Sequence, residues 1–184
     1  ADIQSAAGGS AWWRFTYHKT GLAVSSPLIG TWKLAQIPGA LSVGPNQGDA
    51  SWWSSSANDI FTKDCIFDDS ISFDANGNFI HYMDGSTWLE TWQGVASDQC
   101  GGPIAPHGGG LFNYFYSNNQ LIVNGLGAHL GVPKAVNGGE LSDANPPPVP
   151  TSISYIITFF NGNNSFHADI QSAAGGSAWW RFTY

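Results

Sequence analysis

The sequence predicts an all-β protein, an antiparallel barrel or sandwich of about eight or nine short strands joined by long glycine- and proline-rich loops. Three observations support this prediction. Short segments alternate apolar and polar residues or are rich in aromatic residues, and turn residues separate them. No amphipathic helical pattern lasts longer than a turn or two. The chain also repeats itself, because residues 168–184 are identical to residues 1–17 (ADIQSAAGGSAWWRFTY).

The duplicated segment predicts a β-hairpin. Residues 165–171 (SFHADIQ) alternate apolar and polar, residues 172–176 (SAAGG) form a turn, and residues 177–184 (SAWWRFTY) form an aromatic-rich strand. Neighbouring residues of a strand point to opposite faces. One face therefore carries Trp180, Phe182 and Tyr184, and the other carries Trp179, Arg181 and Thr183. One of these faces must belong to the core.

The duplication predicts a repeat with a period of 167 residues, since residue 168 repeats residue 1. Residues 1–17 are then the last hairpin of a preceding repeat, residues 18–27 a linker, and residues 28–184 one complete β-domain. Because the chain begins inside a predicted strand, we expect it to be part of a longer array. Three interpretations stay open: repeats joined covalently, separate subunits that exchange a strand or hairpin, and an artificial duplication that closes an open sheet.

Composition narrows the classes of partner. Only 10% of the residues are charged and the net charge is −7, which argues against a nucleic-acid partner and against an anionic membrane surface. No apolar run approaches twenty residues, so we expect no membrane span. Abundant glycine, serine, asparagine and threonine with few lysines is typical of extracellular or cell-surface β-proteins. In such a protein Cys65 and Cys100 form a disulfide worth about 3–4 kcal/mol, and the alternative is two buried thiols in a cytosolic protein.

Residues 28–35 (LIGTWKLA) predict the first strand of the domain. Gly30 and Trp32 resemble the G-x-W signature of lipocalin-like domains, in which an arginine of the last strand packs across the tryptophan, and Arg181 would be that arginine. Most of the repeat, from GTWKLA through GPNQGDASWW, WLETWQGVA and GVPKAVNGGEL to WWRF, is also similar to a domain of secreted marine Bacteroidetes proteins. There it accompanies laminarinase-type glycoside hydrolases and other polysaccharide-handling modules. The resemblance implies secretion and a barrel or sandwich.

The middle of the domain alternates loops and strands. Residues 38–56 predict a loop, residues 65–73 (CIFDDSISF) a strand, and residues 74–78 an Asn-Gly hairpin turn that leads into a returning strand. The aspartates Asp68, Asp69 and Asp74 could bind calcium, but hairpin turns favour aspartate for backbone reasons, and we expect no metal.

Residues 87–92 (TWLETW) predict a strand with Trp88, Glu90 and Trp92 on one face. Two aromatic rings beside a carboxylate are suited to sugar binding, although core packing is the commoner reason for such residues. After a long loop come a hairpin over residues 111–116 and 120–124 and a second glycine-rich loop over residues 125–145. The last segment before the duplicated hairpin, residues 151–160, predicts the longest strand.

The sequence predicts a structural repeat unit of an extracellular bacterial filament or long surface adhesin, whose partners are identical copies of itself. The duplicated hairpin is the predicted means of assembly, through Trp12, Trp13, Arg14, Trp179, Trp180 and Arg181. The alternative is a carbohydrate-binding module of a polysaccharide-handling protein that uses Trp52, Trp53, Trp88 and Trp92. A small-ligand carrier would need an empty barrel, which the many large aromatics argue against. No nucleophile motif or metal-ligand spacing is present, so we expect neither an enzyme nor a cofactor.

Overall fold

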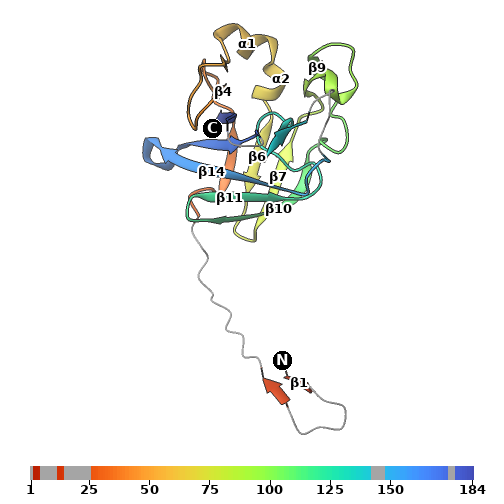
Figure 1. The fold of residues 1–184 in the computed structure, drawn as a ribbon, viewed down its shortest axis with the longest axis vertical. Coiled ribbons are helices and arrows are strands. Elements are labelled where there is room, and N and C mark those ends of the chain that lie inside the picture. Colours follow the sequence, from red (N-terminus) through yellow and green to blue (C-terminus); the bar gives the residue numbers. More distant parts are fainter. Residues whose placement is uncertain (1, 5–11, 15–25, 142–147, 174–176) are drawn as a thin grey trace.

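A ten-stranded antiparallel sheet, curled into a half-barrel, organises the computed structural model of the protein (Figure 1). The structure describes residues 2–4, 12–14, 26–141, 148–173 and 177–184, the first two ranges by their backbone alone. The all-β prediction is therefore confirmed. In spatial order the strands are β3 (Gly30–Lys33), β6 (Ser70–Phe73), β7 (Asn78–Tyr82), β10 (Gly110–Ser117), β11 (Gln120–Asn124), β14 (Ser152–Phe160), β15 (Ser165–Gln171), β16 (Trp179–Thr183), β4 (Leu41–Gly44) and β5 (Trp53–Ser54).

The predicted hairpins form where turn residues mark them. Asn118 and Asn119 join β10 to β11 with φ values of +50° and +62°, the left-handed conformation that a tight two-residue turn requires. Between β6 and β7, the carboxylate of Asp74 accepts hydrogen bonds from the backbone amides of Asn76 (2.8 Å) and Asn78 (2.9 Å). This aspartate therefore stabilises a turn, as the sequence indicated.

The prediction of a loop over residues 38–56 is wrong in part, because the segment contains β4 and β5. All four residues of β4 are buried, including Ser42, since this strand lies between β16 and β5 beneath other parts of the chain. A short strand that is buried on both faces shows no alternation of apolar and polar residues, so it gives no period-two signal.

The prediction of a strand over residues 65–73 is also wrong in its first half. A capping box of Ser56 and Asp59 begins helix α1 (Ala57–Thr62), and helix α2 (Asp64–Phe67) follows before the chain enters β6. Both helices lie at one end of the sheet (Figure 1). The smaller elements are β8 (Thr87–Leu89), η1 (Thr91–Gln93), β9 (Gln99–Gly101), β12 (Ala135–Val136), β13 (Gly139–Glu140) and η2 (Asn161–Asn163).

Large aromatic side chains fill the concave side of the sheet. Tyr155, Phe166 and Phe182 are fully buried, and Phe182 leaves so little room that a methyl group on Gly131 would lie 2.3 Å from its ring. The hydroxyl groups of Tyr155 and Tyr184 accept hydrogen bonds from the backbone amides of Leu130 (2.9 Å) and Gly131 (3.0 Å). The loop over residues 128–132 thus seals the core, which is packed and not hollow.

The two copies of the duplicated segment pair with the same register. In the first copy, β1 (Asp2–Gln4) runs antiparallel to β2 (Trp12–Arg14) and residue 3 lies opposite residue 13. In the second copy, Ile170 lies opposite Trp180, and both positions are shifted by the repeat period of 167. The second copy is an interior hairpin, because β15 also pairs with β14 and β16 also pairs with β4. A segment with this sequence therefore completes the sheet.

Three buried histidines lie in contact beside the core, and they make stability dependent on pH. The ring of His129 lies 4.8 Å from that of His81 and 5.6 Å from that of His107. Burial lowers the pKa of all three, that of His81 to about 4, whereas burial raises the pKa of Asp69 to about 7. The unfolded chain therefore binds more protons at the histidines below about pH 6.5, and the folded chain binds one more at Asp69.

We expect the free energy of unfolding to fall as the pH drops from 6 to 4, because three histidines with lowered pKa outweigh one carboxyl group with raised pKa. Replacing His81 with methionine removes one of these protons, so the decline should become shallower by about 1.4 kcal/mol per pH unit. Urea unfolding at several pH values measures both slopes, with Trp52→Ser, which removes an exposed side chain that does not titrate, as the control. An unchanged slope in the His81 variant would contradict the buried, neutral state of that ring.

Candidate functional site

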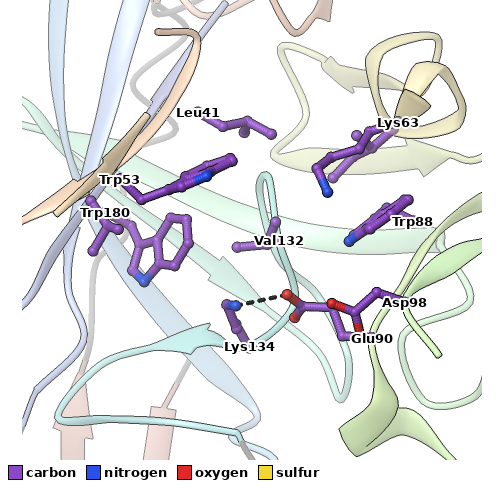
Figure 2. Close-up of a pocket in the computed structure, with 11 residues that line it drawn as sticks. Leu41, Trp53, Lys63, Trp88, Glu90, Asp98, Val132, Lys134 and Trp180 are labelled. Carbon is purple, nitrogen blue, oxygen red and sulfur yellow. Dashed lines mark hydrogen bonds and ion pairs between the residues drawn. The ribbon is translucent and has the colours of Figure 1, made fainter. Parts of the chain in front are cut away.

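A cleft of about 340 Å³ opens between the β4–β5–β16 end of the sheet and the β8 segment (Figure 2). Its base is apolar, and its walls carry three tryptophans and four charged side chains. The lining residues are Leu41, Val43, Trp53, Lys63, Ile66, Trp88, Glu90, Asp98, Val132, Lys134 and Trp180.

Tryptophan rings form two facing walls of the cleft. Trp53 of the edge strand β5 and Trp180 of β16 lie on one side with ring centroids 6.2 Å apart, and Trp88 of β8 lies on the other (Figure 2). The indole N–H of Trp180 donates to Glu140 Oε1 (2.6 Å), which fixes the orientation of that ring. Trp53 keeps 37% of its surface exposed. The cleft therefore presents aromatic surface that is held in place before any ligand arrives.

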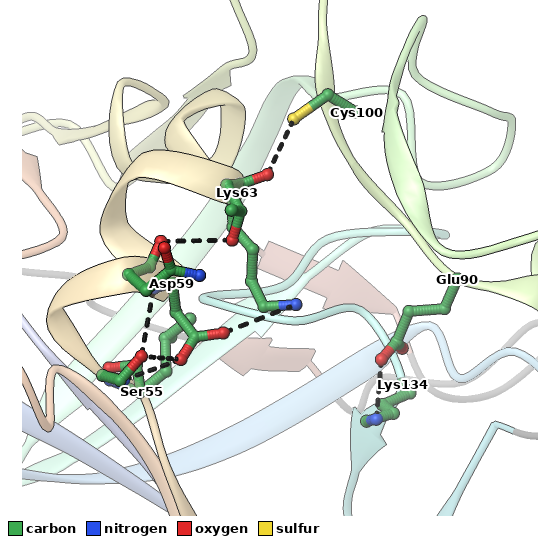
Figure 3. A network of polar contacts seen from close by, with 10 residues as sticks. Ser55, Asp59, Lys63, Glu90, Cys100 and Lys134 are labelled. Carbon is green, nitrogen blue, oxygen red and sulfur yellow. Dashed lines mark hydrogen bonds and ion pairs between the residues drawn. The ribbon is translucent and has the colours of Figure 1, made fainter.

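Glu90 anchors the polar end of the cleft. Its carboxylate accepts from Lys134 Nζ (2.7 Å; Figures 2 and 3). It also accepts from the indole N–H of Trp92 (3.0 Å) and caps the 3-10 turn η1. Both charges of the Glu90–Lys134 pair are largely buried, with 12% and 24% of their side-chain surfaces exposed. Nearby, Asp98 accepts from the backbone amide of Thr91 (2.9 Å). The carboxylates and the ammonium group are thus held by fixed partners.

Lys63 reaches the opposite rim of the cleft from the junction of the two helices. Its ammonium group lies 3.6 Å from the centre of the Trp88 ring, a cation–π contact, and 3.9 Å from Asp59 (Figure 3). The predicted disulfide between Cys65 and Cys100 is present, and it ties α2 to β9. Because Cys100 lies opposite Trp88 in the β8–β9 pair, the disulfide braces this wall of the cleft.

The structure brings two of the four predicted sugar-binding tryptophans together. Trp53 and Trp88 line the cleft, whereas Trp52 is 55% exposed and lies outside it. The prediction that Trp88, Glu90 and Trp92 share a strand face is wrong, because β8 ends at Leu89 and Trp92 belongs to η1. Trp92 instead stands behind Glu90, where it donates to the carboxylate and packs against His107.

Four charged or aromatic residues of the lining were not among the residues that the sequence suggested for sugar binding. Lys63, Asp98 and Lys134 come from segments that sequence places far from one another, and Trp180 was predicted to act in assembly. The alternation along residues 179–184 predicted that Trp180, Phe182 and Tyr184 share a face but left open which face is the core, and in the structure all three are buried. Trp180 lies near the start of β16, and this position near the end of the strand was the indication in the sequence that its ring could also line a cleft.

The side chain of Arg181, on the face of β16 opposite Trp180 and Phe182, makes its polar contacts within its own domain. Arg181 makes two hydrogen bonds to Asp169 (2.7 and 2.8 Å), whose side chain is fully buried and also accepts from Gln47 (2.9 Å). The pKa of the Arg181 guanidinium is raised by this carboxylate. Trp179 in the same copy is partly buried, and the side chains of Trp12, Trp13 and Arg14 lie outside the described residues.

The three residues of the lipocalin-like signature lie on β3 and β16. Trp32 of β3 packs edge-on against Phe166 (4.8 Å) and donates its indole N–H to the carbonyl of Leu28 (2.8 Å). Gly30 opens the same strand with a φ of +140°. The guanidinium of Arg181, the third residue of the resemblance, is bound to Asp169.

Metal-ligating residues gather at one place in the described part of the chain. Asp64, Cys65 and Cys100 bring ligand atoms within 4.8 Å of one another, but the two sulfur atoms are bonded to each other and cannot act as thiolate ligands. Within the same described ranges, no helix has the length and apolar character needed to cross a bilayer.

Comparison of the sequence with protein-family models gives no match, and comparison with curated proteins gives none either.

Proposed function

We propose that the protein is a structural repeat unit of an extracellular bacterial filament or long surface adhesin. In this proposal, residues 1–17 occupy in a neighbouring unit the place that residues 168–184 occupy in this one. The observation that carries the proposal is the shared register: β1 and β2 pair as β15 and β16 do, and β15–β16 is an interior hairpin of the sheet. A second copy of an interior hairpin has no place in a domain that is already complete.

The contacts of the C-terminal copy support insertion into a neighbour more than stacking on its surface. Trp180 and Phe182 contribute to the core, and Arg181 is bound to the buried Asp169. A hairpin of identical sequence carries the same apolar face and the same ion-pairing residues, Asp2 and Arg14, opposite each other in the same register. In such a contact the hairpin takes the place of the neighbour's own residues 168–184 between β14 and β4, and a head-to-tail contact of this kind propagates without closing.

The mass of the native polypeptide, on a reducing denaturing gel and by intact mass, tests the proposal first. A product of several hundred kilodaltons would show covalent repeats, with residues 18–27 as the linker. A product near 19.6 kDa that forms longer polymers under native conditions would show exchange between subunits. A product of that mass that stays monomeric would contradict the proposal.

Substitution of the first copy tests the role of the hairpin. Replacing Trp12 and Trp13 together with serine should shorten or abolish filaments, because the inserted hairpin would lose its largest apolar side chains. The second copy keeps the domain itself intact, so circular dichroism of the variant should be unchanged. Trp52→Ser, which removes an exposed tryptophan outside the cleft, is the matched control. Filaments of normal length from the double variant, seen by negative-stain microscopy, would rule out assembly through this segment.

A further inference from the structure

The cleft between Trp53 and Trp88 is small and presents flat aromatic surface to a ligand. Trp53 is exposed on an edge strand, and Trp88 faces it across the cleft. An apolar base beneath the two rings is formed by Val43, Ile66 and Val132. Aromatic faces of this kind pack against flat ligands that have one apolar side. Its volume of about 340 Å³ is at the lower end of the range for small-molecule sites, which suits a short stretch of a ligand.

The charged residues that line the cleft indicate which polar groups a ligand must carry. Two lysines, Lys63 and Lys134, and two carboxylates, Glu90 and Asp98, line it, so the formal charges cancel. The lysines only donate hydrogen bonds and the ionised carboxylates only accept them. A hydroxyl group does both, so a ligand with several hydroxyl groups can satisfy both kinds of partner.

Other classes of ligand fit this lining less well. A fatty acyl chain would cover four charged groups and leave them without water, which is costly. A polyanion such as a uronic acid polymer would gain from the lysines, but its carboxylates would come close to those of Glu90 and Asp98. Lys134 is also already bound to Glu90, so it offers less free positive charge to an anion.

We propose that this cleft binds a neutral saccharide. The apolar face of a sugar ring stacks on the exposed Trp53, the part of Trp88 that Lys63 leaves uncovered packs against the other side of the saccharide, and the hydroxyl groups bond to the charged groups at the two rims. Because Glu90 holds both Lys134 and Trp92, the polar rim is pre-organised, and little side-chain ordering is needed on binding. This site does not require the proposed assembly function, since Trp180 of the chain's own β16 completes the cleft within one domain.

Titration of the intact chain with soluble neutral oligosaccharides tests the proposal. The probes are cellohexaose, laminarihexaose and mannohexaose, measured by isothermal calorimetry and by tryptophan fluorescence. We expect at least one of them to bind saturably, and both Trp53→Ala and Trp88→Ala to weaken that binding at least about tenfold. Trp52→Ala is the matched control, because this neighbouring tryptophan is more exposed but lies outside the cleft, and it should bind like the unaltered protein.

Three results would overturn the proposal: no binding of any neutral probe, binding of polygalacturonate alone, or neutral binding that Trp53→Ala leaves unchanged. Trp53 lies on the edge strand β5, so its replacement tests the cleft even if Trp88→Ala disturbs folding, which circular dichroism would reveal. All of these measurements are made on a single folded domain. They therefore succeed or fail independently of filament formation.

Discussion

Replacing Asp169 with alanine is expected to destabilise the domain by about 3–5 kcal/mol, the usual cost of removing one partner of a buried ion pair. The side chain of Asp169 is fully buried and accepts three hydrogen bonds, two from Arg181 and one from Gln47. Its loss would leave the guanidinium, of which only a quarter is exposed, without a counter-charge beside the sheet. Urea unfolding followed by tryptophan fluorescence measures the change.

Two variants decide whether the missing charge is the cause. Lys63→Ala removes a partly exposed ion pair of 3.9 Å together with the cation–π contact to Trp88, each worth about 1 kcal/mol or less, so it should cost less than Asp169→Ala. The double variant Asp169→Leu with Arg181→Met replaces both partners by apolar groups and should recover much of the loss. If Asp169→Ala lowered the free energy of unfolding no more than Lys63→Ala does, the Asp169–Arg181 pair would contribute little to stability. The presence of the same two residues in residues 1–17, as Asp2 and Arg14, would then not support insertion of that segment.

Removing the disulfide by the double change Cys65→Ala and Cys100→Ala is expected to cost about 4 kcal/mol. The bond closes a loop between residues 35 apart, and in the chain-entropy model its loss restores that freedom to the unfolded chain. Both cysteines should be changed together, because a single change would leave a reactive thiol. The free energy of unfolding, measured with and without a reducing agent, gives the difference.

The unaltered protein in reducing agent is the control for this experiment, and it should match the double variant. The bond also joins α2 to β9, beside the strand that carries Trp88, so the cleft should loosen before the rest of the sheet. Hydrogen exchange of the β8–β9 amides would then rise more than exchange in β14. Equal stability of the oxidised and reduced proteins would show that the surrounding packing alone holds this end of the fold.

Local sequence signals predicted those parts of the fold that local chemistry controls. Asn118 and Asn119 mark a tight turn, Asp74 marks another, and the longest apolar run became β14. The disulfide was predictable because the chain has only two cysteines. The register of the duplicated hairpin could be expected to be the same in both copies once the identity of the two segments was recognised.

Long-range contacts explain what could not be predicted. β4 carries no alternation because it is covered on both faces, and α2 places Cys65, Ile66 and Phe67 in a helix although they read as a strand. The Glu90–Lys134 pair joins residues 44 apart, so no local pattern indicates it. The cleft is made of such contacts, and only the positions of Trp53 and Trp88 among its residues were expected to bind sugar.

Trp180 belongs both to the cleft and to the hairpin that the chain carries twice, and its counterpart in the first copy is Trp13. In a filament built by hairpin exchange, one subunit would therefore supply part of its neighbour's sugar-binding wall. Thermodynamic linkage then requires that a saccharide which contacts that wall also tightens the joint, by an amount that grows with the logarithm of its concentration. Contacts between subunits would be most stable where the saccharide is abundant, and subunits would dissociate where it is scarce. The length of the polymer would therefore depend on the saccharide concentration at the surface to which it binds.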